Sequence, residues 1–361
     1  MRVAQVAPPL ESVPPLRYGG TERVIATLTD ELVRRGHDVT LFASGDSHTS
    51  ARLVPVVQQA VWHRRPPYHE FLPFWSITLG RLLEKMDDFD VVHSHLDYFG
   101  FPAARACSET PLVSTLHGRV DLPELGPLFE EFDEIPLVSI SNAQREHVPH
   151  ANWVATVYHG IELDAYSFKP EPGRYLAFLG RISPEKGVDS AIRIAERAGM
   201  PIRIAARMPL QAKHDGGARR DWEYYQNEVQ PLLRGPDVEL IGQVGGTHKD
   251  DFLGNAAALL FPISWPEPFG LVMAEALACG TPVLGLRAGS VPEVITDGVT
   301  GFVRDSEDEL VEAVADIGHI DRRRCRQEAE QRFSSAAMAE AYEGVYTRLV
   351  ERHRSDAHVA V

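Results

Sequence analysis

Short apolar runs alternate with amphipathic stretches along the chain, and this alternation occurs twice. In the first half the apolar runs predict β-strands at 2–7, 38–43, 90–93, 112–115, 137–140 and 154–157. In the second half they predict strands at 175–179, 202–205, 238–241, 257–261 and 283–286. Segments between them, such as 188–198 and 221–233, have the apolar spacing of helices. Strands that alternate with helices are typical of parallel sheets, so the pattern predicts an α/β fold.

A Pro- and Gly-rich segment that begins at His159-Gly160 separates the two repeats. It predicts one Rossmann-like, doubly wound domain over 1–158 and a second over 159–335. The last predicted helix, at about 336–361, carries an apolar stripe that includes Tyr342 and Tyr346. Because this helix follows the completed second domain, we expect it to return and pack on the first.

The segment 262–289 places two acidic residues between two predicted strands. Glu267 lies in the loop after the first strand, and Glu275 lies in the helix that follows. Pro268 fixes the backbone before that helix, and Gly270 allows a close approach of backbone and ligand. Open α/β sheets place ligands in the loops at the carboxyl ends of their strands, so the segment predicts a ligand site.

Composition and charge limit the kinds of partner that the protein is expected to bind. The formal net charge is −15 with a pI near 5.5, which disfavours nucleic acid as a partner because that partner needs a basic face. Three cysteines without motif spacing do not form a disulfide framework. No apolar run approaches the roughly 20 residues of a membrane span. We therefore expect a cytoplasmic protein without stable membrane insertion.

Gly19-Gly20 stands before the first predicted helix, at the end of the loop that follows the first strand. The Gly-x-Gly-x-x-Gly run of a dinucleotide site is missing there, which argues against a nicotinamide enzyme. Bare N–H groups and the helix dipole would suit a phosphate group at this position. A flexible turn without a ligand is the alternative interpretation.

A second pair of signals follows the first strand of the second domain, in the sequence GRISPEKG. Arg181 and Lys186 are predicted to lie in the loop between Gly180 and Gly187, just before a helix. Two cations and a helix N-terminus at the carboxyl end of a strand favour a diphosphate ligand. Either cation alone would more simply be a solvated surface residue.

Five segments together resemble one known family. They are Gly19-Gly20 before a helix, HSH at 93–95, TLHG at 115–118, GRISPEKG at 180–187 and EPFGLVMAE at 267–275. The runs GSVPEVI and DGVTGFV support them. The chain closely resembles, from about residue 3 to residue 350, the retaining glycosyltransferases of family 4. The resemblance implies a GT-B fold, in which two Rossmann-like domains face each other across a cleft, and a nucleotide-sugar donor.

The resemblance also implies roles for single residues. Arg181 and Lys186 match the pair that binds the donor diphosphate, Glu275 matches the acid that accepts hydrogen bonds from the ribose, and Glu267 matches the acid that meets the transferred sugar. The residues after Glu267 match those that surround sugar and phosphate with backbone N–H groups. The predicted donor-binding set is Gly19, Gly20, Gly180, Arg181, Lys186, Glu267, Pro268, Phe269, Gly270, Leu271, Val272 and Glu275.

The first domain is expected to complete the reaction site. Gly20 matches a glycine that closes on the phosphate, and His117 matches a histidine near the reacting carbon that holds a sugar hydroxyl. His93, His95 and Tyr18 are candidates for contact with the acceptor. His117, Arg181, Lys186 and Glu267 form the predicted catalytic set.

No metal or other cofactor is expected, since the nucleotide-sugar is a substrate. The run His93-Ser-His95-Leu-Asp97 looks like most of a metallo-hydrolase site, but Tyr98 replaces its last histidine. The sequence 88–90, DFD, formally matches a metal-binding D-x-D, yet it stands at the start of a strand, where a solvated turn is the simpler interpretation.

The donor base and the acceptor stay open at this stage. The segment 207–220 departs from the family pattern in a loop that lies near the base in relatives. Glucose from UDP-glucose, moved to a small soluble acceptor, is the leading hypothesis, and GDP-mannose is the alternative donor. A nucleotide-sugar epimerase of the same two-domain shape and a non-catalytic nucleotide-sugar-binding protein are the rival functions.

Overall fold

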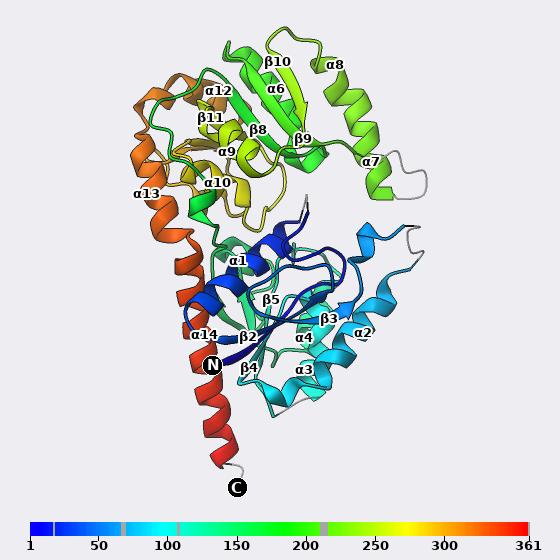
Figure 1. The fold of residues 1–361 in the computed structure, drawn as a ribbon. Helices are drawn as coiled ribbons and strands as arrows, with labels where there is room; N and C mark the ends of the chain where they lie inside the picture. Colours follow the sequence, from blue (N-terminus) through cyan, green and yellow to red (C-terminus); the bar gives the residue numbers. More distant parts are fainter. Residues whose placement is uncertain (17–18, 66–69, 107–108, 210–215, 360–361) are drawn as a thin grey trace. The chain divides into compact units, whose positions relative to one another are not determined.

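The computed structural model describes residues 1–16, 19–65, 70–106, 109–209 and 216–359. The chain divides into two compact units (Figure 1). Unit 1 consists of Met1–Ile161 and Ser334–Val361, and unit 2 consists of Glu162–Phe333. The division therefore lies a few residues beyond the predicted boundary at 158/159.

Unit 1 is built on a parallel sheet of seven strands in the order β3-β2-β1-β4-β5-β6-β7. Its strands are β1 (Arg2–Val6), β2 (Asp38–Ser44), β3 (Arg52–Val57), β4 (Val91–Ser94), β5 (Leu112–Thr115), β6 (Leu137–Ser139) and β7 (Trp153–Thr156). Its helices are α1 (Gly20–Arg34), α2 (Leu72–Leu83), α3 (Phe101–Ala106), α4 (Leu125–Glu131), α5 (Asn142–Glu146) and α14 (Ser335–Val359). Short 3₁₀ turns lie at Val61–His63, Met86–Asp88 and Asp97–Gly100.

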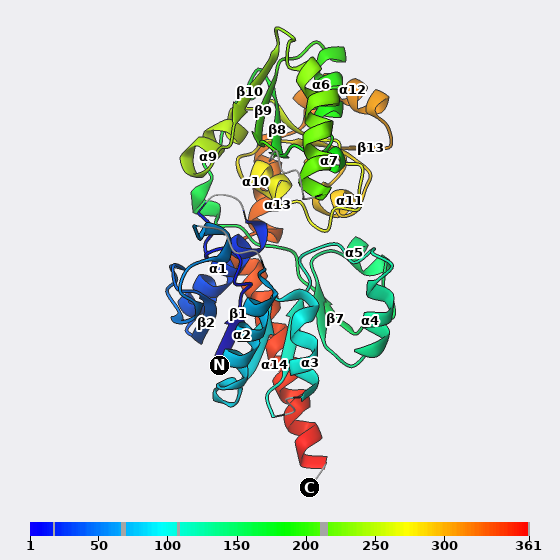
Figure 2. The same cartoon turned by 90° about the vertical axis from the view of Figure 1, so that its right-hand side faces the viewer.

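Helices cover both faces of the first sheet, with α1 and α14 on one face and α2 and α3 on the other (Figures 1 and 2). Successive side chains of a strand point to opposite faces. In β1, Ala4 and Val6 join the core under α2, whereas Gln5 points to α14 and bonds to Tyr346. The last helix thus packs on the first unit, as predicted, and it covers a polar position of the central strand.

Unit 2 has six parallel strands in the order β10-β9-β8-β11-β12-β13. They are β8 (Leu176–Arg181), β9 (Ile202–Arg207), β10 (Val238–Gly242), β11 (Ala258–Phe261), β12 (Val283–Leu286) and β13 (Gly301–Arg304). Its helices are α6 (Val188–Arg197), α7 (Gly216–Tyr224), α8 (Gln230–Leu232), α9 (Gly246–Gly254), α10 (Leu271–Ala278), α11 (Val291–Val294), α12 (Glu307–Ala315) and α13 (Arg322–Arg332). Its 3₁₀ turns are Leu163–Ala165, Pro184–Lys186 and Ile317–His319.

Both sheets share one topology, and it fixes where a ligand can bind. In each unit the strand order reverses beside the first strand, between β1 and β4 in unit 1 and between β8 and β11 in unit 2. Ligands of doubly wound sheets bind at this switch point, beyond the carboxyl ends of the strands. The α/β prediction of two doubly wound sheets is confirmed, and it directs attention to the loops after these four strands.

Two edge strands and one helix differ from the sequence prediction. The edge strands β3 and β13 were not predicted, and for β3 the reason is Pro55 in its middle, which argues against a strand. The helix predicted over 221–233 is interrupted by a π-helical segment, Tyr225–Val229. Pro231 explains the interruption, since a proline cannot donate the regular bond and its ring clashes with the preceding turn of an α-helix.

Candidate active site

The loop after β8 carries the two predicted cations. Arg181 is the last residue of β8, not a loop residue as predicted, and Lys186 ends the 3₁₀ turn that follows. Gly187 has a left-handed φ of 68°, and a Cβ there would lie 2.3 Å from the carbonyl oxygen of Pro262. The backbone N–H of Ser264 donates to the carbonyl of Glu185 at 3.1 Å. The loops after β8 and β11 therefore touch at the switch point.

Lys186 and Glu267 form an ion pair across these two loops. The ammonium group of Lys186 donates to Oε2 of Glu267, and the side chains are only 18% and 10% exposed. The indole N–H of Trp265 donates to the same oxygen at 3.1 Å. Nζ of Lys186 also lies 4.9 Å from the centroid of the Trp265 ring. The residue predicted to meet the sugar and a residue predicted to bind the diphosphate are thus partners of each other.

Arg181 is held by a second group of charges. Its guanidinium donates to Glu185, four residues along the chain, and its Nε lies 3.7 Å from Oδ2 of Asp221 on α7. Arg220 joins them, 2.7 Å from Glu185 and 3.5 Å from Asp221. A diphosphate that binds Arg181 or Lys186 must therefore compete with carboxylates already in place. Glu185, Arg220 and Asp221 carried no signal in the sequence, because only the fold brings α7 to the end of β8.

Glu275 projects from α10 into a third set of contacts. The hydroxyl of Tyr166 and the ammonium of Lys249 both donate to its Oε1, at 2.8 and 2.5 Å. Lys249 is 12% exposed and Glu275 is 6% exposed, so this pair is largely shielded from water. Both contacts use one carboxylate oxygen, which is compatible with the predicted bonds from ribose hydroxyls to the other. Lys249 was not predicted, because nothing near it in the sequence marks a charged partner.

The remaining predicted donor residues frame the start of α10. Gly270 is its N-cap with φ 74°, and Leu271 and Val272 supply the first-turn N–H groups that a helix leaves without internal partners. Phe269 is buried, and its carbonyl accepts a bond from Ser290 Oγ at 2.9 Å. The N–H of Ser290 donates to the carbonyl of Glu267 at 2.9 Å. These bonds hold the loop of Glu267 and Pro268 against the start of α11, whose N-cap is Ser290.

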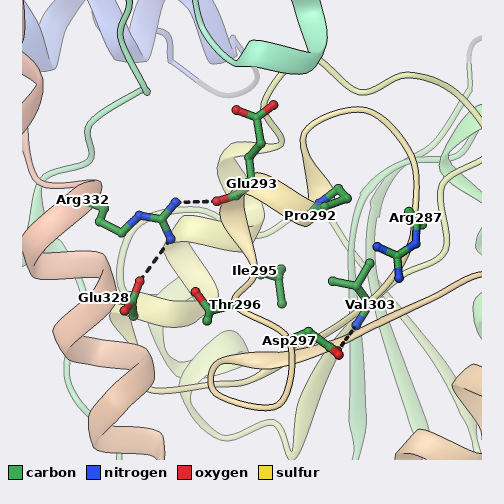
Figure 3. A pocket seen from close by; sticks show the side chains of 9 residues that line it. All are labelled: Arg287, Pro292, Glu293, Ile295, Thr296, Asp297, Val303, Glu328 and Arg332. Atoms are coloured by element: carbon green, nitrogen blue, oxygen red, sulfur yellow. Dashed lines mark hydrogen bonds and ion pairs between the residues drawn. The ribbon is translucent and has the colours of Figure 1, made fainter.

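A cavity of about 510 Å³ lies elsewhere in unit 2, beside α11 (Figure 3). Its residues are Arg287, Pro292, Glu293, Ile295, Thr296, Asp297, Val303, Glu328 and Arg332. Arg332 donates to the carbonyl of Glu293 and to the carboxylate of Glu328, which ties α13 to the wall of the cavity. None of the predicted donor residues lines it, so this cavity is not the predicted site.

In unit 1, Gly19 and Gly20 open α1 as predicted, but a carboxyl group lies beside them. A Cβ on Gly19 would come within 2.8 Å of Oε2 of Glu22. Burial, with smaller contributions from the carboxylates of Glu11 and Asp97, raises the pKa of Glu22 to about 7. A phosphate group would meet this carboxyl at the start of the helix. The role of Gly20 toward a donor stays a prediction.

The three histidines of the HSH and TLHG segments lie side by side but differ in what they can reach. His93 is fully buried, and its ring nitrogens bond to the hydroxyls of Tyr346 and Thr115, both at 2.7 Å. His95 is 1% exposed, and its nitrogens bond to Gln5 at 2.7 Å and to His117 at 2.8 Å.

The prediction that His93 and His95 contact the acceptor is therefore corrected, because protein partners occupy all four of their nitrogens. His117 is partly exposed at the end of β5, and its backbone N–H donates to Asp97 at 3.4 Å. Tyr18, the other acceptor candidate, lies outside the described residues. Within the described ranges, no group of three or more His, Cys, Asp or Glu side chains is arranged to hold a metal ion.

Models of known protein families match both units of the chain. The model of "Glycosyl transferases group 1" matches residues 162–332, and that of "Glycosyltransferase Family 4" matches residues 18–165. The chain is a GT-B glycosyltransferase of family 4. The predicted resemblance is thereby confirmed, and so is the α/β fold of two domains. The glycosyltransferase moves a sugar from a nucleotide-sugar.

Relatives and solved structures of similar length support the assignment. A glycogen synthase of Mycobacterium tuberculosis is 27% identical over 340 residues, which covers 80% of this chain and 79% of the relative. A D-inositol 3-phosphate glycosyltransferase of Mycolicibacterium smegmatis is 26% identical, with 93% and 88% covered.

The crystal structure of AviGT4, a glycosyltransferase involved in avilamycin A biosynthesis, has 26% identity and a TM-score of 0.68, with 97% and 98% covered. The Anabaena HepE structure with UDP-glucose has the same fold, at 16% identity and a TM-score of 0.70, with 98% and 100% covered. In the part of the glycosyltransferase that the structure describes, no helix is long and apolar enough to cross a membrane.

Proposed function

We propose that this glycosyltransferase is a retaining hexosyltransferase that moves glucose from UDP-glucose to a small soluble acceptor without a metal ion. The observation that carries the proposal is the ion pair of Lys186 and Glu267, which joins the loops after β8 and β11 at the switch point of unit 2. UDP-glucose is favoured because HepE, which shares the fold, binds it. The acceptor class and the predicted cytoplasmic location rest on the sequence alone.

The charges of the site suit the departure of a nucleoside diphosphate. When the bond between the anomeric carbon and the phosphate oxygen breaks, negative charge develops on the leaving diphosphate. Lys186 can turn to that diphosphate from Glu267 on the loop after β11, and Arg181 can turn to it from Glu185 in the loop that follows Arg181 itself. Glu267, released from the ammonium group, can then accept bonds from sugar hydroxyls.

The configuration at the anomeric carbon is retained if the acceptor attacks from the face that the diphosphate leaves. The acceptor oxygen forms the new bond to the anomeric carbon, and the acceptor proton passes to an oxygen of the leaving diphosphate. Atoms and charge balance without an enzymic nucleophile. Metal independence is part of the proposal, since the two cations would supply the charge that a metal ion supplies in other transferases.

A donor panel tests the proposal. UDP-glucose, GDP-mannose and ADP-glucose are each incubated with a mixture of sugar, polyol and phenolic acceptors, with and without EDTA. We expect UDP release and an α-linked product only with UDP-glucose, at an unchanged rate in EDTA. Transfer only from GDP-mannose would establish the alternative donor. An epimerised UDP-sugar formed without any acceptor would establish the rival function instead.

A further inference from the structure

A continuous chain of hydrogen bonds crosses the face of the first sheet under α14. Gln5 lies at its centre, directly opposite His93 in the register of β1 and β4. Its Nε2 donates to the hydroxyl of Tyr346 at 3.0 Å, and its Oε1 lies 2.7 Å from Nε2 of His95. Nδ1 of His95 then lies 2.8 Å from Nε2 of His117. The central strand is thus linked to a histidine just beyond the carboxyl end of β5.

The direction of each bond follows from Gln5. A carbonyl oxygen only accepts, so Nε2 of His95 carries a proton and donates it to Oε1 of Gln5. A neutral imidazole has one N–H, so Nδ1 of His95 carries no proton and has a free lone pair. That lone pair accepts the N–H of His117 Nε2. His117 is left with an unprotonated Nδ1.

The opposite direction is disfavoured by the end of the chain. Turning the Gln5 amide round would reverse every bond and put a proton on Nδ1 of His117. That atom is buried, and it has no hydrogen-bond partner in the described part of the chain. A buried N–H without an acceptor is rarer in proteins than an acceptor without a donor. Burial also lowers the pKa of His95 and His117, which keeps both rings neutral.

We propose that Gln5 and His95 are positioning residues that hold His117 in the Nε2–H tautomer, so that its Nδ1, which is buried in this structure, is kept ready to accept a hydrogen bond from a sugar hydroxyl that reaches it. The role toward the hydroxyl rests on the proposed function, whereas the tautomer does not. In this arrangement His117 neither donates to the sugar nor carries charge toward the diphosphate. Its ring accepts a hydrogen bond from one hydroxyl and thereby orients one sugar oxygen.

Nitrogen NMR of the full chain with ¹⁵N-labelled imidazoles measures the tautomer without any substrate. Protonated and unprotonated ring nitrogens have different chemical shifts, and the His117 signals are assigned by their loss in His117→Gln. We expect a proton on Nε2 of His117 in the wild type. A proton on Nδ1 would overturn the proposal.

Variants show whether Gln5 and His95 set that state. Gln5→Met and His95→Met remove the directing groups, so a mixture or a reversal of the His117 tautomer is expected. His95→Gln offers an amide oxygen to His117 and an amide N–H to Gln5, so it should keep the wild-type tautomer. Tyr342→Phe is the control, because it removes a buried hydroxyl that bonds to Thr115 and not to Gln5. An unchanged tautomer in both methionine variants would contradict the proposal.

Turnover gives the functional half of the test. Loss of one hydrogen bond to a substrate hydroxyl should lower kcat/KM about tenfold in His95→Met, with most of it restored in His95→Gln. Thermal unfolding shows whether both variants are folded. If His95→Met is not folded, Gln5→Met takes its place in the kinetic comparison. Equal kcat/KM in the methionine and glutamine variants would refute the positioning role. Absence of any transfer in the wild type would instead refute the proposed function and leave the NMR result standing.

Discussion

The two sheets of this glycosyltransferase have the same strand order but place opposite chemistry at their switch points. In unit 2 the loops after β8 and β11 carry ion pairs, chiefly Lys186 with Glu267 and Arg181 with Glu185. In unit 1 the corresponding residues are Gln5 on β1, His93 on β4 and His95 just after β4. Neutral hydrogen bonds join them, with the hydroxyl of Tyr346 between Gln5 and His93. One topology thus supports a charged site that can exchange partners and a neutral network that fixes proton positions.

The difference shows why the two sites respond differently to substitution. Ion pairs on loops can open for a charged ligand, since a diphosphate replaces the carboxylates that hold the cations. A buried neutral network has no solvent to replace a lost partner, so each missing bond leaves a polar group unsatisfied. Changes in unit 2 should therefore alter turnover first, and changes in unit 1 should alter stability first.

The largest expected effect is on Lys186. Lys186→Met removes the charge that is proposed to stabilise the leaving diphosphate, and kcat should fall roughly 10²- to 10³-fold, as for loss of one oxyanion donor. Initial rates of nucleotide release measure it. Arg197→Met is the control, because that arginine pairs with Asp308 on the surface. Near-normal turnover of Lys186→Met would remove the cation from the mechanism.

Glu275 separates donor binding from the chemical step within unit 2, because it is predicted to bind the donor and not the reacting atoms. Glu275→Gln weakens charge-assisted bonds worth about 1.5–3 kcal/mol each, so KM for the donor should rise roughly 10- to 100-fold. The value of kcat should change far less. Steady-state kinetics with varied UDP-glucose separate the two constants. A fall in kcat with KM unchanged would place Glu275 in the chemical step instead.

Tyr346 tests the neutral network. Tyr346→Phe leaves Nε2 of Gln5 and Nδ1 of His93 without their shared hydroxyl, and the free energy of unfolding should fall by about 1–3 kcal/mol. Urea unfolding measures it, with Tyr342→Phe as the matched variant that loses a single bond to Thr115. Equal stability of the two variants would show that Gln5 and His93 find other partners.

His159 gives the smallest effect, through pH. Burial lowers the pKa of His159 well below its usual 6.5, so below that pH the unfolded chain binds a proton that the folded chain excludes. Stability contributed by the neutral ring is present above pH 6.5 and lost as the pH falls. In His159→Asn the decline below pH 6 should be shallower by about 1.4 kcal/mol per pH unit. If the free energy of unfolding changed with pH in the same way in the wild type and in His159→Asn, the neutral His159 ring would not contribute to the pH dependence of stability.

The comparison also explains what the sequence could predict. Charged residues between Gly180 and Gly187 and around Gly270 predict a ligand site locally, and the structure brings the two segments into contact through Lys186 and Glu267. Lys249 and Arg220 were not predicted, because their partners lie on elements distant in the sequence.

The network of unit 1 was hidden for the same reason. Its geometry depends on the register of β1 against β4 and on the return of α14, so Tyr342 and Tyr346 were recognised only as an apolar stripe. His93 and His95, which were predicted to contact the acceptor, are therefore interior residues, whereas His117 is partly exposed beyond the carboxyl end of β5.

Stabilisation by UDP tests the central claim, that the ion pairs of unit 2 open for a nucleoside diphosphate. A ligand that binds only the folded state at 100 times its Kd should raise the free energy of unfolding by about 2.7 kcal/mol. We predict this stabilisation for the wild type and for Arg197→Met, and its near loss at the same UDP concentration in Lys186→Met. Equal stabilisation of wild type and Lys186→Met by UDP would contradict the account.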